Sequence, residues 1–299
     1  MKHAYLIMAH NEFYILEKLI KLIDDERNDI YLHIDKKVKG FDFEYFKNIP
    51  KKSKIFFTDR IDVKWGTNTQ IECEYILFKE AFKKHYKYYH LLSGVDLPVA
   101  SQDVIHNFFD KNNGKEFVIM DNHNVISNES LERIKLYHFF VPLARSKSKI
   151  LRKLFGMFHF YSIKIQRLFK VNRIKNMNIN FRKGANWVSI TDEFVSYVLS
   201  KENEMMKIFK YSFCADELFV QTLLYNSKFY KNIYSMKNDD YNGIKRSIDW
   251  NRGTPYTFKI EDFEELINSG NFWARKFSTK IDKQIIDKIY EKVKSNDKN

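Results

Sequence analysis

The chain has 299 residues, is 44% apolar and 16% aromatic, and carries a formal net charge of +13. This composition is ample for a packed core. Two cysteines, Cys73 and Cys214, are too few for a disulfide framework or a thiolate metal site, and no apolar run reaches the roughly 20 residues needed to span a bilayer.

Strands and helices alternate along the first half of the chain, which predicts an α/β fold. The predicted elements are strands at 5–8, 30–34, 55–57, 88–92 and 116–120, and helices at 13–23 and 69–82. His10, Asp35 and Asp96 follow the ends of three of these strands. Ligands of open α/β sheets bind outside the carboxyl ends of the strands, so we expect these three residues to share a cleft.

The positive charge is concentrated in one stretch. Residues 133–191 contain 14 Lys and Arg and no Asp or Glu, which accounts for the whole net charge of the chain. Between Arg145 and Lys183 these charges alternate with Leu, Ile, Met and Phe at spacings of three and four residues. This pattern is typical of a helix lying on an anionic membrane. A solvated helix packing one face on the core, or a nucleic-acid-binding segment, would also fit.

The second half continues with a predicted strand at 185–190 and a helix at 192–199. An apolar helix over 213–224 then begins with Asp216 and Glu217. The positive end of a helix dipole favours ionised carboxylates, as a general base requires. Capping of the helix by these acids is the ordinary alternative.

Nine glycines and four prolines leave little room for linkers. We therefore expect one domain over 1–290, with a basic-aromatic insertion at about 144–183 and a frayed tail at 291–299.

Six short motifs in order resemble the core-2/I-branching β-1,6-N-acetylglucosaminyltransferases and the related peptide O-xylosyltransferases. They span roughly residues 4 to 277. These are Tyr5-Leu6-Ile7-Met8-Ala9-His10, His33-Ile34-Asp35, Leu92-Ser93-Gly94-Val95-Asp96-Leu97-Pro98, Lys183-Gly184-Ala185-Asn186-Trp187, Ala215-Asp216-Glu217 and Ala274-Arg275-Lys276-Phe277.

The resemblance implies a GT-A-type fold, with a Rossmann-like mixed sheet flanked by helices, and inverting transfer from a UDP-sugar. It implies that Glu217 is the general base, with Asp216 capping the helix or holding a sugar hydroxyl. The family works without a divalent metal, so no cofactor is expected. This chain has no Asp-x-Asp motif, its nearest approximation being Asp42-Phe43-Glu44. Lys276 matches the family lysine that binds the diphosphate. A second diphosphate cation stays open between Lys259 and Arg252.

The resemblance also implies where the two substrates bind. His10, Asp35 and Trp65 would contact the nucleotide, and Asp96 would anchor a turn near the donor sugar. Glu132, Arg133 and Lys135 lie in a stretch similar to the segment with which the family contacts the acceptor, and Trp187 and Trp250 would stack on sugar faces. Structural packing is the alternative for Trp65, Trp187 and Trp250, and a plain turn is the alternative for Asp35.

The chain departs from animal members, which have a membrane anchor, a stem and several disulfides. We therefore expect a bacterial-type, cytoplasmic enzyme, peripheral at the inner face of the plasma membrane, acting on a lipid-linked glycan in surface polysaccharide synthesis. The first guess for the donor is UDP-N-acetylglucosamine, with a β linkage as product. UDP-xylose, UDP-glucose and UDP-glucuronic acid are alternatives, and so is a non-catalytic basic protein that binds membrane or nucleic acid.

Overall fold

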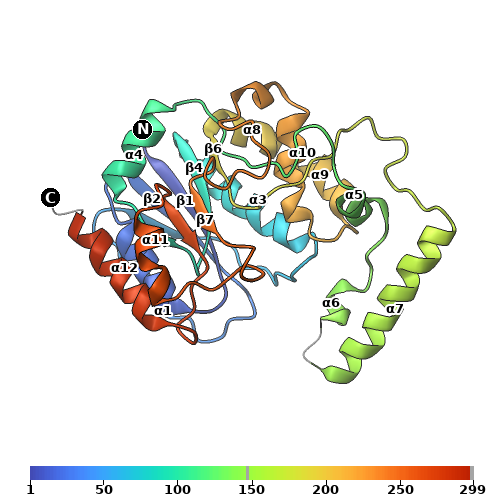
Figure 1. Ribbon diagram of the computed structural model, residues 1–299, viewed down its shortest axis with the longest axis horizontal. Coiled ribbons are helices and arrows are strands. Elements are labelled where there is room, and N and C mark those ends of the chain that lie inside the picture. Colours follow the sequence, from blue (N-terminus) through green and yellow to red (C-terminus); the bar gives the residue numbers. More distant parts are fainter. Residues whose placement is uncertain (146–147, 297–299) are drawn as a thin grey trace.

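A central sheet of five strands organises the computed structural model, which describes residues 1–145 and 148–296 (Figure 1). The strand order is β3-β2-β1-β4-β6. The strands are β1 (His3–Ala9), β2 (Asn28–Ile34), β3 (Lys54–Phe57), β4 (Tyr88–Ser93) and β6 (Ser189–Thr191). The first four run parallel, and β6 pairs antiparallel with β4. The expected mixed sheet flanked by helices is therefore confirmed.

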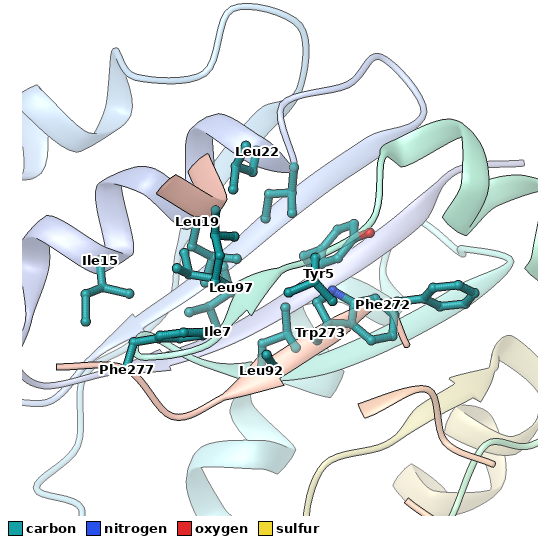
Figure 2. Close-up of a cluster of buried hydrophobic side chains, with 14 of the residues drawn as sticks. Tyr5, Ile7, Ile15, Leu19, Leu22, Leu92, Leu97, Phe272, Trp273 and Phe277 are labelled. Atoms are coloured by element: carbon teal, nitrogen blue, oxygen red, sulfur yellow. The ribbon is translucent and has the colours of Figure 1, made fainter. Parts of the chain in front are cut away.

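Both faces of this sheet are buried under helices. Side chains alternate across a strand, so Tyr5 and Ile7 of β1 belong to one apolar cluster, and Ala4 and Leu6 belong to another. The first cluster includes residues of α1 (Phe13–Leu22), among them Ile15, Leu19 and Leu22 (Figure 2). It also includes residues of α12 (Lys283–Asn296). The second includes residues of α3 (Thr69–Phe82) and α8 (Asp192–Ser200). Two-sided burial explains why β2 and β4 are buried at every position.

A second, three-stranded sheet joins the segment after β4 to the C-terminal part of the chain. It consists of β5 (Leu97–Pro98), β8 (Trp273–Arg275) and β7 (Arg246–Ile248), in the order β5-β8-β7. Leu97 pairs with Ala274, and the Phe277 amide donates to the Val95 carbonyl at 3.1 Å. These contacts place the C-terminal segment against the turn that follows β4.

The remaining helices are mostly short, and the long helix α7 lies apart from the others. The helices are α2 (Phe43–Lys47), α4 (Gln102–Lys111), α5 (Asn128–Lys135), α6 (Val141–Ala144), α7 (Lys149–Leu168), α9 (Glu202–Phe209), α10 (Phe219–Tyr225), α11 (Phe263–Ile267), and the 3-10 turns η1 (Ala215–Glu217), η2 (Lys228–Asn232) and η3 (Ile260–Asp262). The hairpin of α6 and α7 projects from the side of the body, away from the central sheet (Figure 1). No helix among the described residues is long and apolar enough to cross a membrane.

Four sequence expectations need correction. The strand expected at 116–120 is reduced to two isolated bridges, Glu116 to Ile233 and Phe117 to Ser189, because the following amides and carbonyls bond to irregular loops. The strand expected at 185–190 begins only at Ser189. The helix expected over 213–224 is interrupted at Leu218, between η1 and α10.

The tail expected to fray from residue 291 is also wrong over 291–296. These residues continue α12, because Val293 is fully buried against the core. The remaining three residues, 297–299, lie outside the described part of the chain, as do Ser146 and Lys147 of the expected insertion.

Candidate active site

The carboxyl ends of β1, β2 and β4 meet at one edge of the central sheet. The Asp35 amide donates to the Ala9 carbonyl at 3.0 Å, and the Gly94 amide donates to the Met8 carbonyl at 2.9 Å. Because the three strands are parallel neighbours, the residues that follow them lie together. His10, Asp35 and the turn at Asp96 therefore share this edge, as the sequence predicts.

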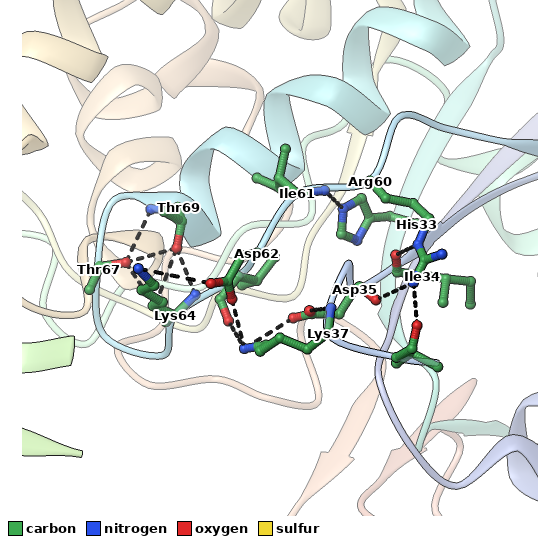
Figure 3. Close-up of polar contacts among 12 residues, drawn as sticks. His33, Ile34, Asp35, Lys37, Arg60, Ile61, Asp62, Lys64, Thr67 and Thr69 are labelled. Carbon is green, nitrogen blue, oxygen red and sulfur yellow. Dashed lines mark hydrogen bonds and ion pairs between the residues drawn. The ribbon is translucent and has the colours of Figure 1, made fainter. Parts of the chain in front are cut away.

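Asp35 is 5% exposed and forms the centre of a turn (Figure 3). Its Oδ1 accepts from the Lys37 amide at 2.8 Å, and its Oδ2 lies 3.3 Å from Lys37 Nζ. Lys37 Nζ also lies 3.2 Å from Asp62 Oδ1. The carboxylate thus stabilises the turn and lies close to the charges of Lys37 and Asp62 at the end of β2. Its contact with the nucleotide stays a prediction.

Arg60 holds the loop after β3 against this turn. Its guanidinium donates to three backbone carbonyls at 2.7–2.8 Å: those of Ile34, Asp35 and Val38. The Ile61 amide donates to His33 Nε2 at 3.1 Å (Figure 3). The loop that carries Trp65 is therefore fixed beside the end of β2.

His10 lies exposed at the same edge. Its pKa is lowered from 6.5, mainly because the surrounding protein desolvates the ring, with Lys37 and Arg275 adding to the effect against the opposing charge of Asp35. The imidazole is therefore neutral at pH 7 and has one donor and one acceptor nitrogen.

Asp96 is almost fully buried, and both of its oxygens have protein partners. Arg275 Nη1 donates to Oδ1 at 2.6 Å, and the Ser93 amide donates to Oδ2 at 2.9 Å. The Arg275 guanidinium also lies over the Trp187 ring, 4.1 Å from its centre. Asp96 therefore anchors the turn and positions Arg275, while Trp187 packs on that arginine.

Lys276 follows Arg275 and is half-buried beside the same turn. It makes no ion pair within residues 1–145 and 148–296. An unpaired ammonium held at the carboxyl end of the sheet can bind a phosphate without first breaking an internal salt bridge.

A second charged group is centred on Glu217. Arg133 Nη1 of α5 donates to Glu217 Oε2 at 2.7 Å, and Lys183 Nζ lies 3.7 Å from the same oxygen. Lys183 is also bonded to Asp121 Oδ2 at 2.7 Å. The Glu217 side chain is 31% exposed, so its carboxylate is accessible while two cations restrict its orientation.

Asp216 differs sharply from its neighbour. It is 7% exposed, and its Oδ2 accepts from Gln70 Nε2 of α3 at 2.7 Å. Burial, followed by the charge of Glu217, raises the pKa of Asp216 to about 7. The expectation that a helix dipole keeps this carboxyl ionised is therefore wrong for Asp216. It lies in the single 3-10 turn η1, and α10 begins only at Phe219, so the effect of desolvation on the pKa outweighs that of the helix dipole.

The comparison with known proteins decides the family. The model described as "Branch: Core-2/I-Branching enzyme" matches residues 3–269. The chain belongs to the core-2/I-branching enzyme family. The fold of this family is GT-A-like, in agreement with the mixed sheet and its flanking helices.

Curated relatives are similar over nearly the whole chain. Xylosyltransferase 2 of Rattus norvegicus is 22% identical over 307 residues, covering 95% of this chain and 33% of the relative. Xylosyltransferase oxt of Drosophila melanogaster is 23% identical over 303 residues, covering 92% and 31%. The chain thus spans about a third of the length of these relatives. A solved structure, HddC from Yersinia pseudotuberculosis, is 13% identical with a TM-score of 0.26 over 36% of this chain and 54% of that one, too low to carry an argument.

The residues predicted to bind the acceptor are only partly associated with Glu217. Glu132 pairs with Arg167 of α7 at 2.6 Å, so its carboxylate faces that helix, and Lys135 lies half-buried at the end of α5. Trp250 is 48% exposed, so its ring is open to solvent. Glu132 is therefore turned away from the second charged group of this core-2/I-branching enzyme, and acceptor binding by Lys135 and Trp250 stays a prediction.

Trp65 connects the nucleotide side to the hairpin of α6 and α7. It is 51% exposed, and the Arg145 guanidinium carbon lies 3.4 Å from the centre of its ring. Its other contact is edge-on with Phe213, at 5.5 Å between ring centres. Arg145 therefore occupies one face of the ring. Stacking of uracil on Trp65 stays a prediction.

From the sequence, Arg133 is expected only in the segment that contacts the acceptor, and Lys183 and Asp121 have no assigned role in the site. Arg133 and Lys183 both lie in the acid-free stretch, and Lys183 opens one of the six motifs. A search for cations near the motifs would have found them, but Asp121 has no such signal. Among the described residues, no three or more His, Cys, Asp and Glu are placed to hold a metal ion together.

Proposed function

We propose that this core-2/I-branching enzyme transfers a sugar from a UDP-sugar to a glycan hydroxyl, with inversion at the anomeric carbon. The observation that carries the proposal is the accessible Glu217 carboxylate held between Arg133 and Lys183. A base of this kind must be reachable by an acceptor hydroxyl and fixed in direction, and Glu217 meets both conditions.

In the proposed reaction the acceptor oxygen attacks C1 of the donor sugar. Its proton passes to Glu217 as the new C–O bond forms. The bond from C1 to the diphosphate oxygen breaks on the opposite face, and UDP leaves with the electron pair. Lys276 would neutralise the charge that develops on the diphosphate.

The same proposal assigns the nucleotide to the edge formed by His10, Asp35 and Trp65. Uracil and ribose offer donors and acceptors that a neutral imidazole and a carboxylate can bind. Because a fixed ammonium can take the place of Mg²⁺ on the leaving group, we propose turnover without a divalent metal.

For the donor, UDP-N-acetylglucosamine, forming a β linkage, remains the first proposal. UDP-xylose is the second candidate, because the curated relatives are xylosyltransferases. UDP-glucose and UDP-glucuronic acid complete the panel. The proposed acceptor is a lipid-linked glycan of surface polysaccharide synthesis at the cytoplasmic face of the membrane. The basic, apolar α7 supports this location.

The test is UDP release from each donor, measured with and without EDTA. Glu217→Gln should reduce turnover by on the order of 10²–10⁴-fold. Glu193→Gln, an exposed position of α8, is the matched control and should leave turnover unchanged. Near-full activity of Glu217→Gln would remove the proposed base, and loss of activity in EDTA would remove the metal-free mechanism. Absence of turnover with every donor would favour a non-catalytic basic protein.

A further inference from the structure

Helix α7 exposes the apolar face that an amphipathic helix ordinarily buries. Six positions at intervals of three and four residues define this apolar stripe: Ile150, Leu154, Met157, Tyr161, Ile165 and Leu168. Their exposed fractions range from 39% to 79%. Among the 20 residues of the helix, only Gln166 is buried. Exposed apolar surface in a continuous stripe marks an interaction site.

Basic side chains flank one side of the apolar stripe. Lys149, Lys153 and Lys164 are all exposed and make no ion pair with a described residue. The spacing of these lysines along the helix keeps them on a single side, next to the stripe. The opposite side of α7 packs on α6, where Phe155 and Phe158 lie 6.1 Å from the Phe140 ring.

The hairpin is firmly attached to the body. The Gln166 side chain both accepts from the Tyr137 amide at 2.7 Å and donates to the Tyr137 carbonyl at 2.9 Å. Near the other end, Arg145 lies on Trp65. The stripe is thus held in a fixed position on the surface while remaining uncovered.

We propose that the apolar stripe of α7 docks on the surface of an anionic lipid bilayer. The stripe would enter the boundary between headgroups and acyl chains, and the adjacent lysines would bind anionic headgroups. A nucleic acid would use the lysines but leave the aliphatic stripe without a partner. A second copy of the chain would bring two rows of like charges together. Of these three partners, the bilayer alone binds both the apolar stripe and the lysines beside it.

Docking here would fix the active site near the membrane. Arg167 of α7 binds Glu132, and the next residue of α5, Arg133, binds Glu217. The docked helix is therefore connected to the proposed base by two consecutive residues of one short helix. That the acceptor is held in the same bilayer rests on the proposed function, whereas the docking itself does not.

The experiment is co-sedimentation of the whole chain with vesicles. Phosphatidylcholine vesicles containing phosphatidylglycerol should pellet the protein, pure phosphatidylcholine should pellet much less, and added salt should weaken binding. Replacing Ile150, Met157 and Ile165 by Ser should abolish pelleting. Replacing Lys149, Lys153 and Lys164 by Glu should reduce the affinity about 100-fold or more, since each basic residue contributes roughly fivefold.

Matched controls separate this surface from general properties of the chain. Ser at Val104, Val125 and Ile281 removes three exposed apolar residues elsewhere. Glu at Lys47, Lys111 and Lys231 makes the same change in net charge at other exposed positions. Both triple controls should pellet like the native chain, and circular dichroism verifies that every variant is folded.

Several outcomes would overturn docking. The first is native protein that stays in the supernatant, and the second is a stripe variant that still pellets. The third is DNA that displaces the native chain from vesicles while the Ser variant still binds DNA, which would identify a nucleic acid as the partner. A dimer in sedimentation velocity that the Ser substitutions dissociate would identify a second copy as the occupant. UDP release measured on the same samples separates the two proposals, because vesicle binding needs no turnover.

Discussion

Glu74 of α3 is a buried carboxyl whose replacement should stabilise the fold. Its side chain is 0% exposed, and neither oxygen makes a hydrogen bond of regular geometry within the described chain. Burial, followed by the charge of the nearby Asp216, raises the pKa of Glu74 well above 4.5, and the Asn186 amide acts in the opposite direction. The folded protein therefore binds this proton more tightly than the unfolded chain does.

The sign of the pH dependence follows from that difference. Above pH 4.5 the unfolded chain releases the proton while the folded protein retains it, so the free energy of unfolding falls as the pH rises. The slope is about 1.4 kcal/mol per pH unit for one group. Glu74→Gln keeps the shape of the side chain but cannot ionise. The free energy of unfolding of the variant should therefore rise relative to that of the native chain by this amount for each unit of increasing pH.

Urea denaturation at pH 5, 6 and 7, followed by tryptophan fluorescence, measures the gain. The gap between the two midpoints should widen by about 0.5 M per pH unit for a slope m of roughly 3 kcal/mol/M. Glu72→Gln, on the solvent side of the same helix, is the control and should show no such trend. A gap that stays constant with pH, or a variant less stable than the native chain at pH 7, would refute the reasoning.

Three further predictions concern the site and the core. Arg133→Met should lower kcat on the order of 10–100-fold with little change in KM for the donor, because the Glu217 carboxylate loses its 2.7 Å partner. Steady-state kinetics of UDP release test this, and a rise in KM as large as the fall in kcat would contradict it. Gly184→Ala should destabilise the fold strongly, because a Cβ there would lie 1.9 Å from the Ile119 carbonyl oxygen, and an unchanged Tm would contradict the packing. His90 is fully buried, and desolvation is the main reason that its pKa lies well below 6.5. Below pH 6.5 the unfolded chain binds a proton that the folded protein does not, so the free energy of unfolding falls by about 1.4 kcal/mol per pH unit as the pH falls. His90→Gln should therefore reduce the fall in Tm between pH 6.5 and 5.5, and an identical fall in the variant would contradict this.

Local sequence patterns were sufficient to predict four strands of the central sheet. The apolar runs at 5–8, 30–34, 55–57 and 88–92 are strands, and each predicted end lies within two residues of the observed one. Strands that are buried on both faces have nearly continuous apolar sequences, which is why they could be recognised. The positions of His10, Asp35 and Asp96 follow from the same runs, since a residue after a parallel strand has only one edge on which to lie.

The second sheet had no comparable signal. Its strands are two or three residues long, too short for any periodicity, and Leu97 meets Ala274 only when the fold is complete. The partners of Glu217 were hidden for the same reason. Arg133 is 84 positions away in sequence, and no local pattern relates two charges at that separation.

Helix α7 shows most clearly where local information ends. The spacing of its apolar residues predicts a helix with one apolar face, because that periodicity is a property of the helix alone. Whether such a face is buried depends on what other parts of the chain pack against it. In this fold α6 covers one side of α7, Glu132 of α5 binds Arg167 near the end of α7, and the apolar stripe remains uncovered.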